Sequence, residues 1–106
     1  RCISLQPDSP FHGLEGLKHM ATAIVPKIYD PTLADRDIGI STEASYAMVR
    51  RVAREEGLLI GISSGAALVG CLQVAAELHR KKQEAVMVTV FADSGDKYLS
   101  ERFWDE

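Results

Sequence analysis

The run Ala85-Val-Met-Val-Thr-Val-Phe-Ala92, followed at once by Asp93-Ser-Gly-Asp96, decides the fold class expected for this chain. The run is apolar except for Thr89 and is β-branched in its middle, which is typical of a strand buried on both faces of a parallel sheet. Ligands of open α/β sheets bind beyond the carboxyl ends of the strands. We therefore expect Ser94, in the turn after the strand, to lie where a ligand binds.

Outward from this strand, helical and strand-like patterns alternate along the chain. Apolar spacing and capping signals predict helices over residues 14–25, from Ser41 or Thr42 to Gly57, over 66–78 and over 97–104, and strands over 37–41, 58–61 and 85–92. This order predicts a three-layer α/β arrangement with a mainly parallel sheet and helices on both faces. Residues 1–106 are expected to form a single α/β unit.

Two of the predicted helices carry specific signals. In the helix that ends at Gly57, the residues expected to face the core are Ala44, Met48, Val49, Val52 and Ala53. The helix over 66–78 has almost no polar face in its first turns, so it must be covered on nearly all sides. We expect it to pack against more of the same protein or a partner subunit; the alternative is that the other elements of this chain wrap it.

Composition narrows the function classes. The chain has 106 residues and a net charge of -3, which gives no basic footprint for nucleic acid. No apolar run reaches the roughly 18 residues that a membrane span needs. Cys2 and Cys71 show no metal-ligand spacing, so we expect no metal site and a cytoplasmic protein. The length suits one small domain but is short for a complete α/β enzyme with its own cofactor cleft, and the abrupt start suggests a fragment.

Two turns are candidate ligand sites, because each follows a predicted strand and opens a predicted helix. The first, Gly61-Ile-Ser63-Ser64-Gly65, combines glycines with capping hydroxyls, although such a turn is more often only a helix start. In the second, Asp93 could cap the last helix, or Ser94 could hydrogen-bond a heteroaromatic nitrogen and leave it unprotonated. The three histidines share no spacing, and no catalytic set can be assembled.

The order of several motifs resembles one enzyme family. These motifs are Gln6-Pro7, His12-Gly-Leu-Glu-Gly16, Ile24-Val-Pro-Lys-Ile-Tyr-Asp30, the run from Ala53 to Ala67, and Asp93-Ser-Gly-Asp-Lys-Tyr-Leu-Ser100. In this order they resemble the carboxyl-terminal third of cysteine synthases (O-acetylserine sulfhydrylases), which are pyridoxal-phosphate enzymes of fold type II. The resemblance covers the whole chain.

The resemblance implies roles for particular residues. Ser94, with Asp93 beside it, corresponds to the serine that contacts the pyridine nitrogen of pyridoxal phosphate, while Gly16 and the turn with Gly61, Ser63 and Ser64 line the substrate cleft. The family reaction replaces the β-substituent of an activated serine with a sulfide donor, and the cofactor ring serves as the electron sink.

The resemblance also implies what this stretch lacks. The family's Schiff-base lysine and phosphate loop lie upstream of the matched region, so no catalytic residue is assigned here. The chain alone is expected to be inactive and to bind no cofactor. Two hypotheses remain. The chain is part of a cysteine synthase that acts on a small-molecule substrate, completed by an amino-terminal region or by a homo-oligomer. Alternatively, it is a stand-alone truncated domain that self-associates or binds a partner.

Overall fold

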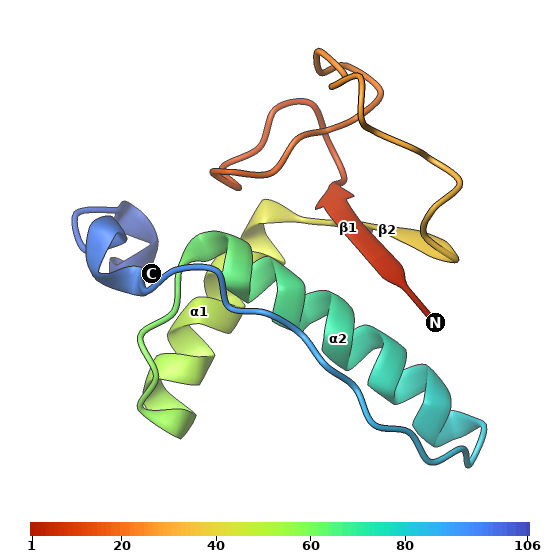
Figure 1. The fold of residues 1–106 in the computed structure, drawn as a ribbon. Coiled ribbons are helices and arrows are strands. Elements are labelled where there is room, and N and C mark those ends of the chain that lie inside the picture. Colours follow the sequence, from red (N-terminus) through yellow and green to blue (C-terminus); the bar gives the residue numbers. More distant parts are fainter.

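Two parallel strands form the sheet of the computed structural model, which describes residues 1–106 (Figure 1). Strand β1 (Ile3–Pro7) pairs with β2 (Arg36–Ile40) in a register that runs from Ile3 opposite Arg36 to Pro7 opposite Ile40. In β2, Ile38 and Ile40 are buried and their neighbours are exposed, as alternation across a sheet requires. The predicted α/β class with a parallel sheet is therefore confirmed.

Helix α1 (Thr42–Glu56) begins and ends at the predicted signals. The Ser41 hydroxyl accepts a hydrogen bond from the Ala44 amide at 3.1 Å, and Gly57 ends the helix in the left-handed conformation at φ +66°. Val49 and Val52 are buried as predicted, while the other three residues of the expected stripe are only half-buried. Ser45 is fully buried instead, and its hydroxyl donates to the Ser41 carbonyl.

Helix α2 (Ile62–Arg80) packs between α1 and the sheet. At its crossing with α1, a Cβ on Gly65 would lie only 2.8 Å from the Ser45 carbonyl oxygen, so the two backbones approach closely. Its other end is tied to β2 by a bidentate ion pair between Arg36 and Glu77. Within this chain α2 is not covered on all sides, because Leu72 remains 40% exposed.

The helix predicted over 14–25 is absent, and turns take its place. Gly16 adopts a left-handed conformation with φ +89°, which a right-handed helix excludes. Leu14 is fully buried, but Ile24 is 91% exposed, so the predicted apolar face never meets a core. A short helix without a buried face is not stable. The spacing of apolar residues over 14–25 therefore predicted a helix that does not form.

The predicted strand over 58–61 is reduced to a single bridge, and the one over 85–92 forms no ladder at all. Residues 83–92 are extended and run beside α2 (Figure 1), but Val86, Val88 and Val90 are 94%, 89% and 73% exposed. The prediction that this segment is buried on both faces is wrong for this chain, because no hydrogen-bonded strand flanks it.

The last predicted helix, over 97–104, is replaced by two single turns of 3₁₀ helix. These are η1 (Gly95–Tyr98) and η2 (Arg102–Asp105). They are held by side chains from elsewhere, with the Phe103 ring stacked on Tyr46 of α1 at a centroid distance of 4.5 Å. The segment is positioned by this packing rather than by helical hydrogen bonds.

Candidate functional site

The two turns identified in the sequence form one unit in space. Ile60 and Ser94 pair as an isolated antiparallel bridge. The Gly61 amide donates to the Asp93 carbonyl at 3.1 Å, and the Gly95 amide donates to the Leu59 carbonyl at 3.0 Å. The amino end of α2 and the end of the extended segment are therefore fixed to each other by backbone hydrogen bonds.

Two glycines make this close approach possible. A Cβ on Gly61 would lie 1.8 Å from Asp93 Oδ1, and one on Gly95 would lie 2.6 Å from the Ile60 carbonyl oxygen. Side chains at either position would push the turns apart. The space at these glycines is thus filled by the opposite turn of the same chain.

The Asp93 carboxylate anchors the unit. Its Oδ2 accepts a hydrogen bond from the Tyr98 hydroxyl at 2.9 Å, and this bond raises the pKa of Tyr98. Its Oδ1 is buried without a hydrogen-bond partner and lies against Gly61, the N-cap of α2. The positive end of the helix dipole favours a negative charge there. Asp93 therefore contacts Tyr98 and the helix end; it caps neither 3₁₀ turn.

Ser94 is exposed at the outer side of the unit. Its hydroxyl donates to the Asp96 carboxylate, which lowers the pKa of Asp96. A ligand nitrogen at this position would compete with Asp96 for the same hydroxyl proton. The structure thus presents Ser94 as an accessible neutral donor at the carboxyl end of an extended segment.

The remaining predicted residues divide between this unit and a separate loop. The Ser64 hydroxyl donates to the Asp93 carbonyl at 3.4 Å, whereas the half-buried Ser63 makes no side-chain hydrogen bond. Gly16 is exposed in the loop after β1, and no hydrogen bond connects it to either turn. The structure brings Asp93, Ser94, Gly61 and Ser64 together and leaves Gly16 apart.

Tyr98 and Trp104 are the structural residues that the sequence reasoning missed. The Trp104 indole donates to the Tyr98 carbonyl at 2.7 Å, and Tyr98 itself is buried to 9% exposure against the core. A buried tyrosine normally needs a partner for its hydroxyl. An aromatic residue five positions after a turn aspartate was the one signal of this contact in the sequence.

The side chains available at the site limit which cofactor or metal ion it can bind. All five lysines are exposed, namely Lys18, Lys27, Lys81, Lys82 and Lys97. A Schiff-base lysine is activated by desolvation in an apolar pocket, and no lysine here is buried in one. No group of three acidic, histidine or cysteine side chains is placed to bind a metal, and neither helix has an apolar stretch long enough to cross a bilayer. Among the predicted site residues, Ser94 supplies an exposed neutral hydroxyl that a ligand can reach.

The chain matches one enzyme family and several of its members. The model of the pyridoxal-phosphate dependent enzyme family matches residues 6–93. The chain is 49% identical over 98 residues to the cysteine synthase of Aquifex aeolicus, covering 92% of this chain and 30% of that protein. It is 35% identical over 103 residues to cysteine synthase B of Pseudomonas aeruginosa, covering 97% of this chain and 33% of the relative.

Solved structures agree on the fold. The cysteine synthase of Entamoeba histolytica superposes with a TM-score of 0.84 at 26% identity, over 98% of this chain and 32% of that one. The O-acetylserine dependent cystathionine β-synthase of Helicobacter pylori superposes with a TM-score of 0.77 at 31% identity, over 96% of this chain and 34% of that one. The chain spans about a third of the length of the proteins it matches.

Proposed function

The chain belongs to the pyridoxal-phosphate dependent enzyme family, and we propose that it forms the carboxyl-terminal part of a cysteine synthase. The complete protein would exchange the β-substituent of an activated serine for a sulfide donor. The observation that carries the proposal is the exposed Ser94 hydroxyl, held at the end of the extended segment by the paired turns. The chain matches only about a third of each relative, which supports the proposal that it is one part of a larger enzyme.

Pyridoxal phosphate, when bound in the complete enzyme, supplies the ring that takes up electrons from the substrate. In this proposal Ser94 turns its hydroxyl from Asp96 to the ring nitrogen. A neutral hydroxyl leaves that nitrogen unprotonated, whereas a carboxylate there would hold it protonated. Asp93 is held by the Tyr98 hydroxyl and by contact with Gly61 at the amino end of α2, and in this proposal it thereby fixes the position of the adjacent Ser94.

The substrate side of the proposed site is formed by the first turn and the loop after β1. Ser63 has a hydroxyl without a partner, at the start of α2 where free amides favour a substrate carboxylate. Ser64 stays bonded to the second turn and is a positioning residue. Gly16 and Gly61 are assigned to the substrate side by the resemblance alone, because Asp93 fills the space beside Gly61 and Gly16 lies apart from both turns. A homo-oligomer in the cytoplasm is part of this proposal, as is the absence of nucleic-acid partners.

A chimera tests the role of Ser94. This chain replaces the matching third of the Aquifex aeolicus cysteine synthase, and pyridoxal-phosphate absorbance and cysteine formation are measured. We expect the chimera to bind cofactor and make cysteine, and Ser94→Asp to lower kcat/KM by about a hundredfold or more, since one carboxylate changes the ring protonation state. Ser94→Thr, which keeps the hydroxyl, is the matched control and should retain most activity.

Equal activity of Ser94→Asp and the parent chimera would refute the role of Ser94. Borohydride reduction of the 106-residue chain with pyridoxal phosphate tests whether a further region is required. We expect no single lysine to be labelled stoichiometrically in preference to the others, because none of the five is buried in a pocket. Stoichiometric labelling of one lysine would show that the chain carries its own Schiff-base residue.

A further inference from the structure

One stripe of side chains on α1 contacts both the loop that carries Gly16 and the C-terminal segment that carries Ser94. Thr42, Tyr46 and Arg50 are spaced four residues apart, so they lie on one face of the helix, which we call the α1 stripe. The loop meets this stripe at Thr42 and Tyr46, and the C-terminal segment meets it at Tyr46 and Arg50. The two segments, which share no hydrogen bond with each other, therefore share one support.

The loop end of the α1 stripe holds the backbone of Gly13. The Gly13 amide donates to the Thr42 hydroxyl at 3.0 Å, and the Tyr46 hydroxyl donates a longer bond of 3.5 Å to the Gly13 carbonyl. A Cβ on Gly13 would collide with the Tyr46 hydroxyl, so only glycine allows this approach. The loop is thus fixed to α1 at a defined position.

Hydrogen-bonded turns carry this position on to Gly16. The Glu15 amide donates to the Gly13 carbonyl, and the Leu17 amide donates to the Leu14 carbonyl, both at 3.1 Å. Leu14 is fully buried between these turns. Because Gly16 lies inside the second turn, its place follows from where Gly13 is held.

The other end of the α1 stripe holds Phe103. The Phe103 ring is 3% exposed and stacks on the Tyr46 ring, with 4.5 Å between the centroids and 11° between the planes. Arg50 Nη1 donates to the Phe103 carbonyl at 2.5 Å. Ring packing and a hydrogen bond to a charged donor together fix this residue.

Contacts within the C-terminal segment lead from Phe103 back to Ser94. The Trp104 ring lies 4.8 Å from the Phe103 ring, and its indole donates to the Tyr98 carbonyl at 2.7 Å. The Tyr98 hydroxyl in turn donates to the carboxylate of Asp93, which precedes Ser94. The position of Ser94 thus depends on where Phe103 is seated.

Charges from both segments act on Tyr46. Burial raises the pKa of Tyr46, and the carboxylates of Glu101, Glu43 and Glu15 raise it further. Glu15 belongs to the loop and Glu101 to the C-terminal segment. The phenol stays protonated at neutral pH and can donate to the Gly13 carbonyl.

We propose that Tyr46 is a positioning residue, which together with Thr42 and Arg50 holds the Gly16 loop and the Ser94 segment at a fixed separation. The inference rests on the proposed function, because that function assigns the substrate to the one segment and the cofactor ring to the other. A displacement of about 1 Å between reacting groups can cost roughly a hundredfold in rate. A support common to both segments keeps that displacement small.

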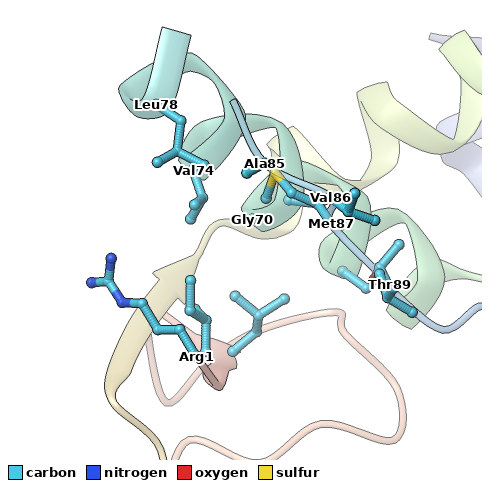
Figure 2. A pocket seen from close by; sticks show the side chains of 13 residues that line it. Arg1, Gly70, Val74, Leu78, Ala85, Val86, Met87 and Thr89 are labelled. Carbon is cyan, nitrogen blue, oxygen red and sulfur yellow. The ribbon is translucent and has the colours of Figure 1, made fainter. Parts of the chain in front are cut away.

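The cavity of about 340 Å³ in Figure 2 takes no part in this arrangement. It lies between Arg1, the face of α2 that carries Gly70 and Val74, and the extended residues Ala85 to Thr89. None of its lining residues belongs to α1, to the loop after β1 or to the 3₁₀ turns. The α1 stripe acts by direct contact with the two segments.

Hydrogen exchange in the 106-residue chain tests the two ends of the α1 stripe separately. Thr42→Val removes an acceptor at the loop end, so we expect exchange at residues 13–17 to accelerate about fivefold and exchange at 93–104 to change less than about twofold. Arg50→Met removes a donor at the other end and should give the reverse pattern.

Substitutions of Tyr46 test the residue that touches both segments. Tyr46→Leu loses the hydroxyl and the stacked ring, so exchange should accelerate in both segments. Tyr46→Phe keeps the ring, so residues 93–104 should exchange as in the wild type. Arg54→Met, on the exposed side of α1, is the matched control and should change neither segment. Emission of Trp104, the single tryptophan, reports independently whether the C-terminal turns stay seated.

Kinetics in the chimera with the Aquifex aeolicus enzyme provide a readout that a loss of stability alone would not separate. Thr42→Val should raise KM for O-acetylserine about fivefold and change kcat less than about twofold, because it frees the substrate side. Arg50→Met should shift the pyridoxal-phosphate absorbance and lower kcat about fivefold at nearly constant KM, because it frees the segment of Ser94.

Three results would overturn the proposal. Equal acceleration of both segments in Thr42→Val and in Arg50→Met would show that α1 stabilises the chain only as a whole. Wild-type exchange in Tyr46→Leu would show that this ring holds neither segment. Parental KM in an active chimera that carries Thr42→Val would show that the loop position does not affect the substrate.

Failure of the proposed function has a different signature. It appears in the parent chimera, as a lack of bound cofactor or as equal activity of Ser94→Asp. The exchange measurements use the chain without cofactor, so they decide whether Tyr46 holds the two segments in either case.

Discussion

Strand β2 and the segment 85–92 are both extended and rich in apolar residues, yet only β2 is part of a sheet. Ile38 and Ile40 of β2 are 5% and 2% exposed, while Val86 and Val88 are almost fully exposed. The backbone conformation is the same in kind at both places. The difference lies in the neighbours, because β2 pairs with β1 and residues 85–92 have no flanking strand.

This contrast shows that a strand pattern makes two separate predictions. One is an extended backbone, and the other is burial of the side chains. The valine-rich run is extended, as its β-branched side chains favour. The burial that the same pattern requires depends on neighbouring strands, and this chain of 106 residues provides none beside it. Mutations in the two segments should therefore have very different effects on stability.

The largest difference is expected between Ile40→Ala and Val88→Ala. Ile40 is almost fully buried in the core, so its truncation leaves a cavity and should lower the free energy of unfolding by about 3 kcal/mol. Val88 is 89% exposed, and its truncation should change the free energy by less than about 0.5 kcal/mol. Urea unfolding followed by circular dichroism measures both. Comparable losses would mean that residues 85–92 are buried in solution.

The helix crossing that follows β2 should be the next most sensitive place. Gly65→Ala places a Cβ 2.8 Å from the Ser45 carbonyl oxygen, so α1 and α2 must move apart, and we expect a loss of about 2 kcal/mol. Gln73→Ala on the exposed side of α2 is the matched control and should be neutral or slightly stabilising. Equal stability of the two variants would contradict the close crossing.

The sequence identified the elements whose signals are local. Ser41 and Gly57 fixed both ends of α1, because a cap needs only its own neighbours. The helix predicted over 14–25 failed because its apolar face had no partner and Gly16 adopted a left-handed conformation. Asp93 and Ser94 were found as a turn, but their pairing with Leu59 to Gly61 and with Tyr98 depends on contacts that no local pattern encodes.

A smaller loss of stability is expected at Tyr98, which binds Asp93 at the end of the unpaired segment. Tyr98→Phe leaves Asp93 Oδ2 without its donor and should cost about 1 kcal/mol. The Asp93 bond raises the pKa of Tyr98. The native state thus retains the proton longer than the unfolded chain, so this stabilisation is complete below pH ~10 and is lost as the pH rises through the native pKa.

Urea unfolding of the wild type and of Tyr98→Phe between pH 8 and pH 11 measures how stability depends on pH. Tyr29→Phe is the control for an exposed tyrosine. Wild type and Tyr29→Phe should lose stability with the same slope, and Tyr98→Phe should lose less. A Tyr98→Phe slope as steep as that of the wild type would show that the phenol is not held by Asp93.

The smallest effect is expected at the ion pair that ties the start of β2 to α2. Arg36 binds both carboxylate oxygens of Glu77, at 2.6 and 2.9 Å, and lowers the pKa of Glu77. The unfolded chain therefore takes up this proton at a higher pH than the native state. The stabilisation is present above the unfolded glutamate value of about 4.3 and is lost as the pH falls through the native pKa.

Glu77→Gln should remove this acid dependence and change stability only slightly at neutral pH, because both side chains are partly exposed and solvent screens the pair. Glu55→Gln, which breaks the exposed pair with Arg51 inside α1, is the matched control. Unfolding measured between pH 3 and pH 6 should separate the two variants, since only the Arg36–Glu77 pair joins a strand to a helix. If the two gave the same pH profile, the attachment of β2 would depend on the buried Ile38 and Ile40 alone.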